Sequence, residues 1–240
     1  KYPSTILLAE SVHIGFVNYG RSLGFNVLSD QELVDYGGFD LLYQYNTIEP
    51  LTNYLNNGDK IELDRYKALL LSDLGSLSSS ALRIRGLENH DQKRLIEYTS
   101  SLTRMKNLLA FQNFMRGPLF IYNGLETKAD HVLSLFTKDL LDLSIDEKWF
   151  TFVKKMIEFK KNEKDLLISI PLLTLGENLA VVNHYKDHKL LGLFSLGESS
   201  SSIEHKDIED GEYLDLISGQ KVVIKDHSLE VKEPLFLKKI

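Results

Sequence analysis

Two groups of polar residues follow apolar segments of the chain and contain the carboxylates best placed for chemistry. Glu10 comes directly after the apolar run 6–9, and Asn89, His90 and Asp91 follow a second apolar run. Parallel α/β sheets and barrels build their sites at the carboxyl ends of strands. Cleavage of a glycosidic bond needs one carboxylic acid to protonate the leaving oxygen and one carboxylate to stabilise the oxocarbenium-like transition state. Glu10 and Asp91 are candidates for such a pair.

Both groups also have a purely structural interpretation. A strand has to end in something polar, so Glu10 alone indicates little. The composition of residues 89–91 suits a turn that caps a helix beginning near Gln92. Spacing alone leaves the catalytic and the structural interpretations open.

The elements that would position these residues are βα units. Four short apolar runs, each followed by a polar turn, alternate with segments of helical period and predict a parallel sheet; they are 5–9, 41–45, 81–87 and 119–122. Two stripes at spacings of three and four predict buried helix faces: Tyr98, Leu102, Met105 and Leu109, and Trp149, Val153 and Met156. Residues 144–147 predict a capping box at the start of the second helix.

The pattern changes near Asp165. Five short β-rich runs follow without intervening helices and predict an antiparallel domain; they are 178–185, 189–196, 212–217, 221–224 and 235–237. Residues 199–202 read as a small polar loop. We therefore expect two domains, 1–164 and 165–240. Four βα units leave an apolar edge and an unfilled interior, so a partner half is implied.

Three segments resemble conserved regions of the α-amylase family. Residues 86–91, Gly-Leu-Glu-Asn-His-Asp, resemble the Asn-His-Asp region at the seventh barrel strand, and residues 7–11 resemble the fifth-strand region that ends in the acid/base glutamate. Residues 116–126 are similar to the eighth strand and its loop, Gly-x-Pro-x-Ile-Tyr-x-Gly-x-Glu. Residues 39–43 fit the sixth strand, and the tail is similar to the family's β-sandwich. The resemblance implies the C-terminal half of a (β/α)8 TIM barrel followed by an antiparallel β-sandwich domain.

The resemblance also implies a role for each candidate residue. Glu10 would be the general acid/base, Asp91 would stabilise the transition state, and His90 would bind sugar hydroxyls. Asn89 would either bind substrate or hold the turn. A structural role in the loop after the eighth strand is implied for Tyr122, Asn123 and Glu126.

One family feature is absent from the sequence. The nucleophilic aspartate of the family follows the fourth strand in a Gly-x-Arg-x-Asp setting, and the nearest string, residues 21–25, lacks the aspartate. Truncation before the fifth strand accounts for this absence. We expect a retaining α-glycoside hydrolase acting on α-glucans or oligosaccharides, inactive as this fragment alone. The alternatives are a glucosyltransferase or isomerase of the same family, a non-catalytic carbohydrate-binding relative, or an unrelated α/β domain.

Composition restricts the partners. The formal net charge is -6 with lysine and arginine dispersed, which argues against nucleic acid. No run of about 18 apolar residues occurs, which argues against a membrane-spanning helix. The chain has no cysteine, so it has neither a disulfide nor a thiolate metal site. No metal cluster is visible in the sequence, and the resemblance implies that any calcium site involves the missing amino-terminal half.

Overall fold

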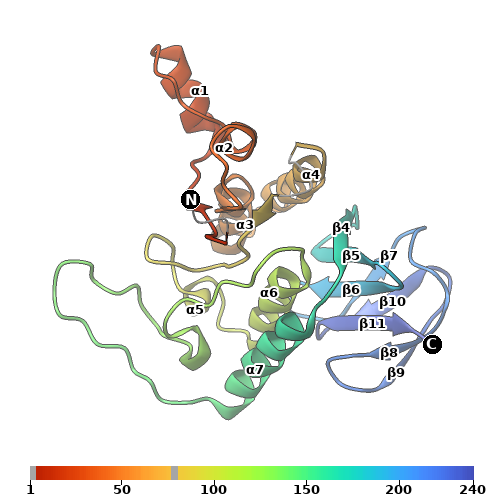
Figure 1. The fold of residues 1–240 in the computed structure, drawn as a ribbon. Coiled ribbons are helices and arrows are strands. Elements are labelled where there is room, and N and C mark those ends of the chain that lie inside the picture. Colours follow the sequence, from red (N-terminus) through yellow and green to blue (C-terminus); the bar gives the residue numbers. More distant parts are fainter. Residues whose placement is uncertain (1–3, 77–80) are drawn as a thin grey trace. The chain divides into compact units, whose positions relative to one another are not determined.

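The computed structural model describes residues 4–76 and 81–240. The chain divides into two compact units, Lys1–Arg85 and Gly86–Ile240, and each is described by itself (Figure 1).

In residues 4–76 and 81–85, the first unit contains a small parallel sheet and four helices. Its strands are β1 (Leu8–Ala9), β2 (Leu41–Leu42) and β3 (Leu82–Arg83), in the order β1-β2-β3. Leu41 of β2 lies opposite Leu8 on one side and Leu82 on the other, so the carboxyl ends of the three strands lie at one edge of the sheet. The helices are α1 (Ile14–Ser22), α2 (Asp30–Asp35), α3 (Tyr45–Asn57) and α4 (Lys60–Ser76).

Local signals explain where these helices begin and end. Ser29 caps α2 in a capping box with Glu32, whose side chain accepts the Ser29 amide at 2.7 Å. Helix α3 ends at Gly58, which has a left-handed φ of 69° that glycine adopts without steric cost. Leu42 of β2, Leu51 of α3 and Leu63 of α4 are almost completely buried and form part of the core of this unit.

The second unit begins with helices and continues into two antiparallel sheets. The helices are α5 (Leu95–Tyr98), α6 (Leu102–Phe114), η1 (Leu125–Thr127) and α7 (Glu147–Asn162). The larger sheet has the order β4-β5-β6-β11-β8-β9, with β4 (Leu166–Leu172), β5 (Asn178–Tyr185), β6 (Lys189–Ser195), β11 (Leu235–Lys239), β8 (Gly211–Asp215) and β9 (Lys221–Ile224). The smaller sheet pairs β7 (Ser201–Glu204) with β10 (Ser228–Val231).

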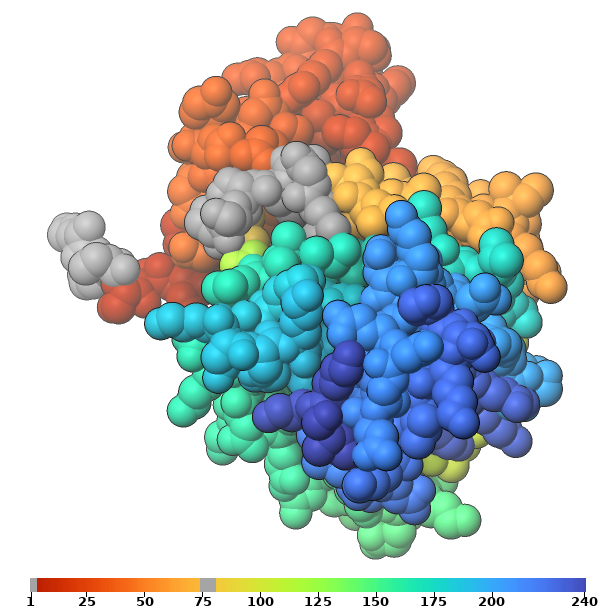
Figure 2. All heavy atoms as spheres, turned by 90° about the vertical axis from the view of Figure 1, so that its right-hand side faces the viewer, coloured from red at the N-terminus to blue at the C-terminus, as the bar shows by residue number. Residues whose placement is uncertain are grey.

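The two sheets pack through a shared apolar core. Leu193 of β6 and Leu237 of β11 in the larger sheet belong to the same buried cluster as Ile203 of β7 and Val231 of β10. The antiparallel domain expected from the sequence is therefore present. Its strands form a continuous packed surface in the space-filling view (Figure 2).

Helix α6 packs on the larger sheet through aromatic side chains. The ring of Phe114 lies 4.8 Å from that of Phe236 and 5.9 Å from that of Phe194, measured between centroids. A Cβ atom at Gly192 would lie 2.7 Å from the Phe114 ring, so glycine is needed for this close approach. Of the stripes expected from the sequence, Met105 and Leu109 in α6 and Trp149, Val153 and Met156 in α7 are buried. Leu102 is only half-buried, and Tyr98 belongs to the separate helix α5, so the first stripe does not lie on one helix.

Several sequence predictions need correction. The three parallel strands are each two residues long, and in the segment 119–122 only Leu119 forms an isolated bridge. Helix α7 is capped by Asp146, whose side chain accepts the amides of Lys148 and Trp149; Ser144 does not provide the cap. Residues 201 and 202 belong to β7 and not to a loop. The boundary at 164/165 stays a prediction. Among the described residues, no helix is long and apolar enough to cross a membrane.

Candidate active site

Glu10 lies one residue beyond β1, at the carboxyl edge of the small sheet. Its Oε1 accepts a hydrogen bond from the hydroxyl of Tyr45 at 3.2 Å, and its side chain is exposed. Tyr45 begins α3 just after β2, and its ring stacks on that of Tyr43 with centroids 5.5 Å apart. Two strand ends therefore provide the carboxylate and the hydroxyl that orients it.

A largely buried network ties the ends of the same three strands together. The carbonyl of Tyr43 accepts hydrogen bonds from Ser11 Oγ at 3.0 Å and from Arg83 Nη1 at 2.9 Å. Arg83 also pairs with Asp73 at 2.5 Å and with Asp30 at 2.8 Å. Burial opposes the charge of Arg83, but the hydrogen bonds and charges of these aspartates raise its pKa. The sheet edge that carries Glu10 is thus fixed by a charged and fully paired guanidinium.

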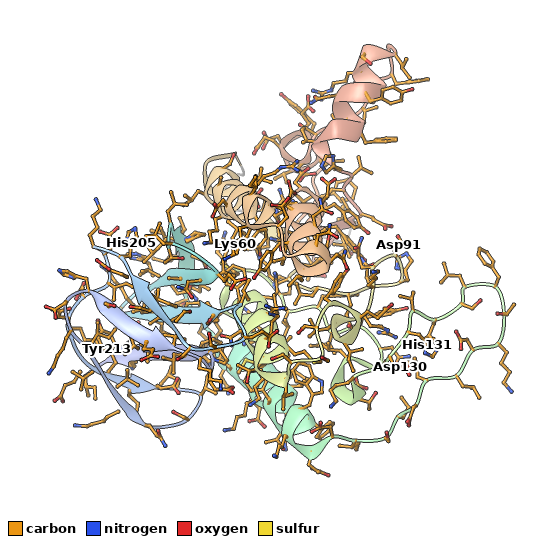
Figure 3. All side chains as sticks on the ribbon, turned by 180° about the vertical axis from the view of Figure 1, so that it is seen from behind. Lys60, Asp91, Asp130, His131, His205 and Tyr213 are labelled. Carbon is orange, nitrogen blue, oxygen red and sulfur yellow. The ribbon has the colours of Figure 1, made fainter. Side chains whose placement is uncertain are left out.

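Asn89, His90 and Asp91 form a turn that precedes α5 in the second unit. The side chain of Asn89 is buried, and its Oδ1 accepts the amide of Asp91 at 2.8 Å. His90 Nε2 lies 3.3 Å from Asp91 Oδ2, and both side chains are partly open to solvent. Figure 3 shows Asp91 on the loops of this unit, away from the strands that carry Tyr213. Asn89 therefore holds the turn, and His90 and Asp91 are available to a ligand.

A buried ion pair under this turn was not found from the sequence. Glu88 immediately precedes the turn, and its Oε1 lies 3.1 Å from Nη1 of Arg94, which is completely buried. In the sequence both residues look like ordinary charged residues beside a helix start, since nothing in a single sequence shows that they are buried. The sequence feature that could have pointed to this ion pair is the separation of the two opposite charges by six residues.

In the segment after residue 119, Tyr122 has a packing contact in keeping with the structural role expected for it, and the roles of Asn123 and Glu126 stay predictions. The ring of Tyr122 lies under the guanidinium of Arg94, 4.4 Å from Cζ. The carbonyl of Leu125 in η1 accepts the indole N–H of Trp149 at 2.6 Å. Gly124 has a φ of 94°, and a Cβ atom there would lie 2.7 Å from Cβ of Ala129. This loop is packed tightly against Arg94 and α7.

The predicted site residues are divided between the two units. Glu10 belongs to the first, and Asn89, His90 and Asp91 belong to the second. The structure brings the last three together in one turn, and the pairing of Glu10 with Asp91 stays a prediction.

Comparison with known proteins shows similarity to α-amylases. Residues 174–236, which include most of the two antiparallel sheets, match the family model for the bacterial α-amylase C-terminal domain. Over its whole length the chain is similar to the crystal structure of an α-amylase from Lactobacillus plantarum, with 27% identity and a TM-score of 0.84. These matches are consistent with the carboxyl-terminal portion of an α-amylase-family protein. The resemblance to the carboxyl-terminal portion of α-amylases expected from the sequence is thereby confirmed.

Other solved structures share the α-amylase fold. A maltogenic α-amylase from Thermotoga neapolitana is 18% identical with a TM-score of 0.73, and the match covers 95% of this chain and 59% of that one. An α-amylase from Anoxybacillus is 16% identical with a TM-score of 0.71, and the match covers 98% of this chain and 52% of that one. The Lactobacillus match covers 100% of this chain and 56% of that one, so the chain spans just over half of these α-amylases. No curated protein matches the sequence significantly.

Proposed function

We propose that this chain is the carboxyl-terminal half of an α-amylase-type glycoside hydrolase that cleaves α-glycosidic bonds in glucans or oligosaccharides with retention of configuration. The observation that carries the proposal is the similarity of this whole chain to 56% of the Lactobacillus α-amylase, combined with Glu10 at the end of β1 and Asn-His-Asp beyond β3. In this proposal residues 1–164 complete a (β/α)8 barrel with the preceding half, and residues 165–240 form the β-sandwich.

Glu10 is the proposed general acid/base. Its carboxyl group would protonate the departing glycosidic oxygen and then take a proton from the water that hydrolyses the glycosyl intermediate. The Tyr45 hydroxyl, which already donates to Oε1, fixes the rotation of the carboxylate. Exposure of the side chain leaves its other oxygen open to a substrate.

Asp91 is the proposed transition-state stabiliser, and His90 is a proposed ligand of sugar hydroxyls. A carboxylate near the anomeric carbon stabilises positive charge that develops only in the transition state, so it acts mainly on kcat. The 3.3 Å contact between Nε2 of His90 and Oδ2 of Asp91 lets the imidazole restrict the carboxylate. The turn held by Asn89 directs both side chains.

The nucleophile of the proposed mechanism belongs to the amino-terminal half. In this proposal an aspartate that follows the fourth strand forms the covalent bond to the sugar, as in the family pattern. We propose that any calcium ion also binds through that half. The 240-residue chain alone is therefore expected to show no turnover, and clear turnover by it would contradict the division of the site.

A product assay on the full-length protein tests the proposal. Incubation with a maltooligosaccharide, followed by proton NMR of the first products, is expected to show net hydrolysis with the α-anomer formed first, as retention requires. Appearance of the β-anomer first would refute the retaining mechanism. Chain-transfer products in place of net hydrolysis would favour a glucosyltransferase of the same family.

A further inference from the structure

The turn that carries His90 and Asp91 is closed at its base by one buried carboxylate. Oε1 of Glu88 pairs with Nη1 of Arg94 at 3.1 Å, and Oε2 accepts the amide of Leu95 at 2.6 Å. Glu88 precedes the turn and Arg94 and Leu95 follow it, so the side chain at one end of the loop binds the other end through both of its oxygens. The turn between them has little freedom to move relative to its base.

Arg94 connects this loop to a distant part of the same unit. Its Nε donates to the carbonyl of His131 at 2.9 Å, and its guanidinium stacks on the ring of Tyr122. Its own amide donates to Oε2 of Glu97 at 2.7 Å and starts α5. One residue thus anchors the turn and the loop 122–131 through its side chain, and the start of a helix through its backbone amide.

Glu88 and Arg94 are both buried, so each charge needs the other as its counter-ion. Burial raises the pKa of Glu88 above its ordinary 4.5, and the Leu95 amide and Arg94 act in the opposite direction. Loss of Arg94 would leave a buried carboxylate without its counter-ion, which favours protonation or rearrangement of the loop. Lysine is a poor replacement, because an ammonium cannot form the two directed contacts and stack on a ring together.

We propose that Arg94 is a positioning residue for Asp91 and His90, acting through Glu88. The inference rests on the proposed function, in which Asp91 stabilises the transition state. Arg94 is completely buried and touches no substrate, so its effect passes through the loop it anchors. Small displacements of a catalytic group are costly, and about 1 Å reduces a rate by as much as about 100-fold.

The test compares Arg94→Lys with Arg104→Lys in the full-length protein. Arg104 is a matched control in the same unit, because its guanidinium also joins a carbonyl, that of Leu196 at 2.5 Å, to a carboxylate, that of Glu198 at 3.3 Å. We expect kcat on a maltooligosaccharide to fall about 10- to 100-fold in R94K with KM changed less than about threefold, and R104K to retain wild-type kcat. Equal kcat values in the two variants would overturn the proposal.

A second comparison separates positioning from general destabilisation. If Arg94 acts through Asp91, R94K should lower the residual kcat of an Asp91→Asn variant by no more than about twofold, because coupled residues are not additive. The same loss in both backgrounds would indicate a merely structural role and overturn the proposal. Should R94K not fold, Tyr122→Leu removes the stacking ring and leaves the ion pair; it is then expected to lower kcat severalfold, and an unchanged kcat would overturn the proposal.

A spectroscopic readout keeps this inference distinct from the proposed function. The ring resonances of His90 should shift in R94K and stay in place in R104K, whatever the protein's activity. Unshifted resonances in R94K would overturn the positioning role. An inactive wild-type protein, or full activity in D91N, would instead refute the proposed function, and the His90 resonances would still decide whether Arg94 fixes the turn.

Discussion

The hydroxyl of Tyr45, at the start of α3, donates a hydrogen bond to the carboxylate of Glu10, at the end of β1, across 3.2 Å. This contact joins residues 35 positions apart and is exposed to solvent on the carboxylate side. It gives a candidate acid/base a fixed orientation before any substrate binds, which is a requirement for efficient proton transfer.

Removal of this hydroxyl should slow catalysis without unfolding the protein. We expect Tyr45→Phe in the full-length enzyme to lower kcat/KM about 3- to 10-fold, in line with the loss of one hydrogen bond of about 1 kcal/mol. Tyr36→Phe is the control, because Tyr36 is highly exposed and lies in the same unit. Steady-state kinetics that leave Y45F indistinguishable from Y36F would contradict the orienting role.

The ion pairs of Arg83 should be important for stability. Replacement by methionine leaves Asp73 and Asp30 largely buried without a counter-ion, so we expect Arg83→Met to lower the free energy of unfolding by about 3–5 kcal/mol. Arg65→Met removes only partly exposed pairs with Glu49 and Glu62 and should cost less than about 1 kcal/mol. Urea denaturation of the full-length protein measures both, and similar losses would show that the Arg83 network contributes little.

Gly124 should tolerate no side chain. Alanine there would combine a left-handed φ of 94° with a Cβ atom 2.7 Å from Ala129 and 2.8 Å from Leu141. We expect Gly124→Ala to destabilise the protein by about 2–4 kcal/mol, the sum of backbone strain and overpacking. Gly219→Ala has a similar φ of 75° and no atom within 4 Å, so it should cost only the backbone part, about 1 kcal/mol. Equal melting temperatures for the two variants would argue against the tight packing at Gly124.

The stability of the loop around His131 should depend on pH. His131 lies between Asp130, 2.7 Å from Nδ1, and Asp139, 3.1 Å from Nε2 (Figure 3 shows Asp130 and His131). The hydrogen bond to Asp130, followed by that to Asp139, raises the pKa of His131 above its ordinary 6.5. The contribution of protonated His131 to the stability of the loop is therefore fully present below pH 6.5 and is lost as the pH rises through the raised pKa.

Asp130 and Asp139 determine how the stability of this loop changes at acidic pH. The hydrogen bond from His131 lowers the pKa of Asp130, and the amide of Ser134 followed by His131 lowers that of Asp139, both from an ordinary 3.8. Their contributions are present above pH 3.8 and are lost as the pH falls through the lowered values. Exchange protection of the Ser134 amide, which donates to Asp139, should be higher at pH 5 than at pH 8 after correction for intrinsic rates. A His131→Gln control should lack the difference, and equal protection in the wild type would contradict the ion-paired arrangement.

The sequence predicted most strands of the larger antiparallel sheet, because short β-rich runs without intervening helices follow Asp165. The predicted strands 178–185 and 221–224 agree with β5 and β9 to the residue. Strand β4, which contains Pro171, was not predicted. Strands β7 and β10 of the smaller sheet were not predicted either, because Ser201, Ser202 and Ser228 are typical of loops. In those cases pairing with a neighbouring strand outweighs local propensity.

Parts of the candidate site could be found from the sequence, and others depend on tertiary contacts. Glu10 and the Asn-His-Asp turn were recognisable from their positions after apolar runs and from the family motif. The burial of Glu88 and Arg94 was not, because opposite charges near a helix start usually lie on the surface. Asp146, and not Ser144, caps α7, since hydrogen bonds to Lys148 and Trp149 decide which of two acceptable residues takes the position.

The most direct test of the account is the activity of Glu10→Gln on two substrates that differ in leaving group. Cleavage of a maltooligosaccharide needs a proton on the departing oxygen, whereas release of fluoride from an α-maltosyl fluoride does not. In the full-length enzyme we predict that E10Q loses at least about 100-fold in kcat/KM on the oligosaccharide and far less on the fluoride, with the melting temperature unchanged. Full activity of E10Q on the oligosaccharide, or equal losses on the two substrates, would contradict the assignment of Glu10 as the general acid.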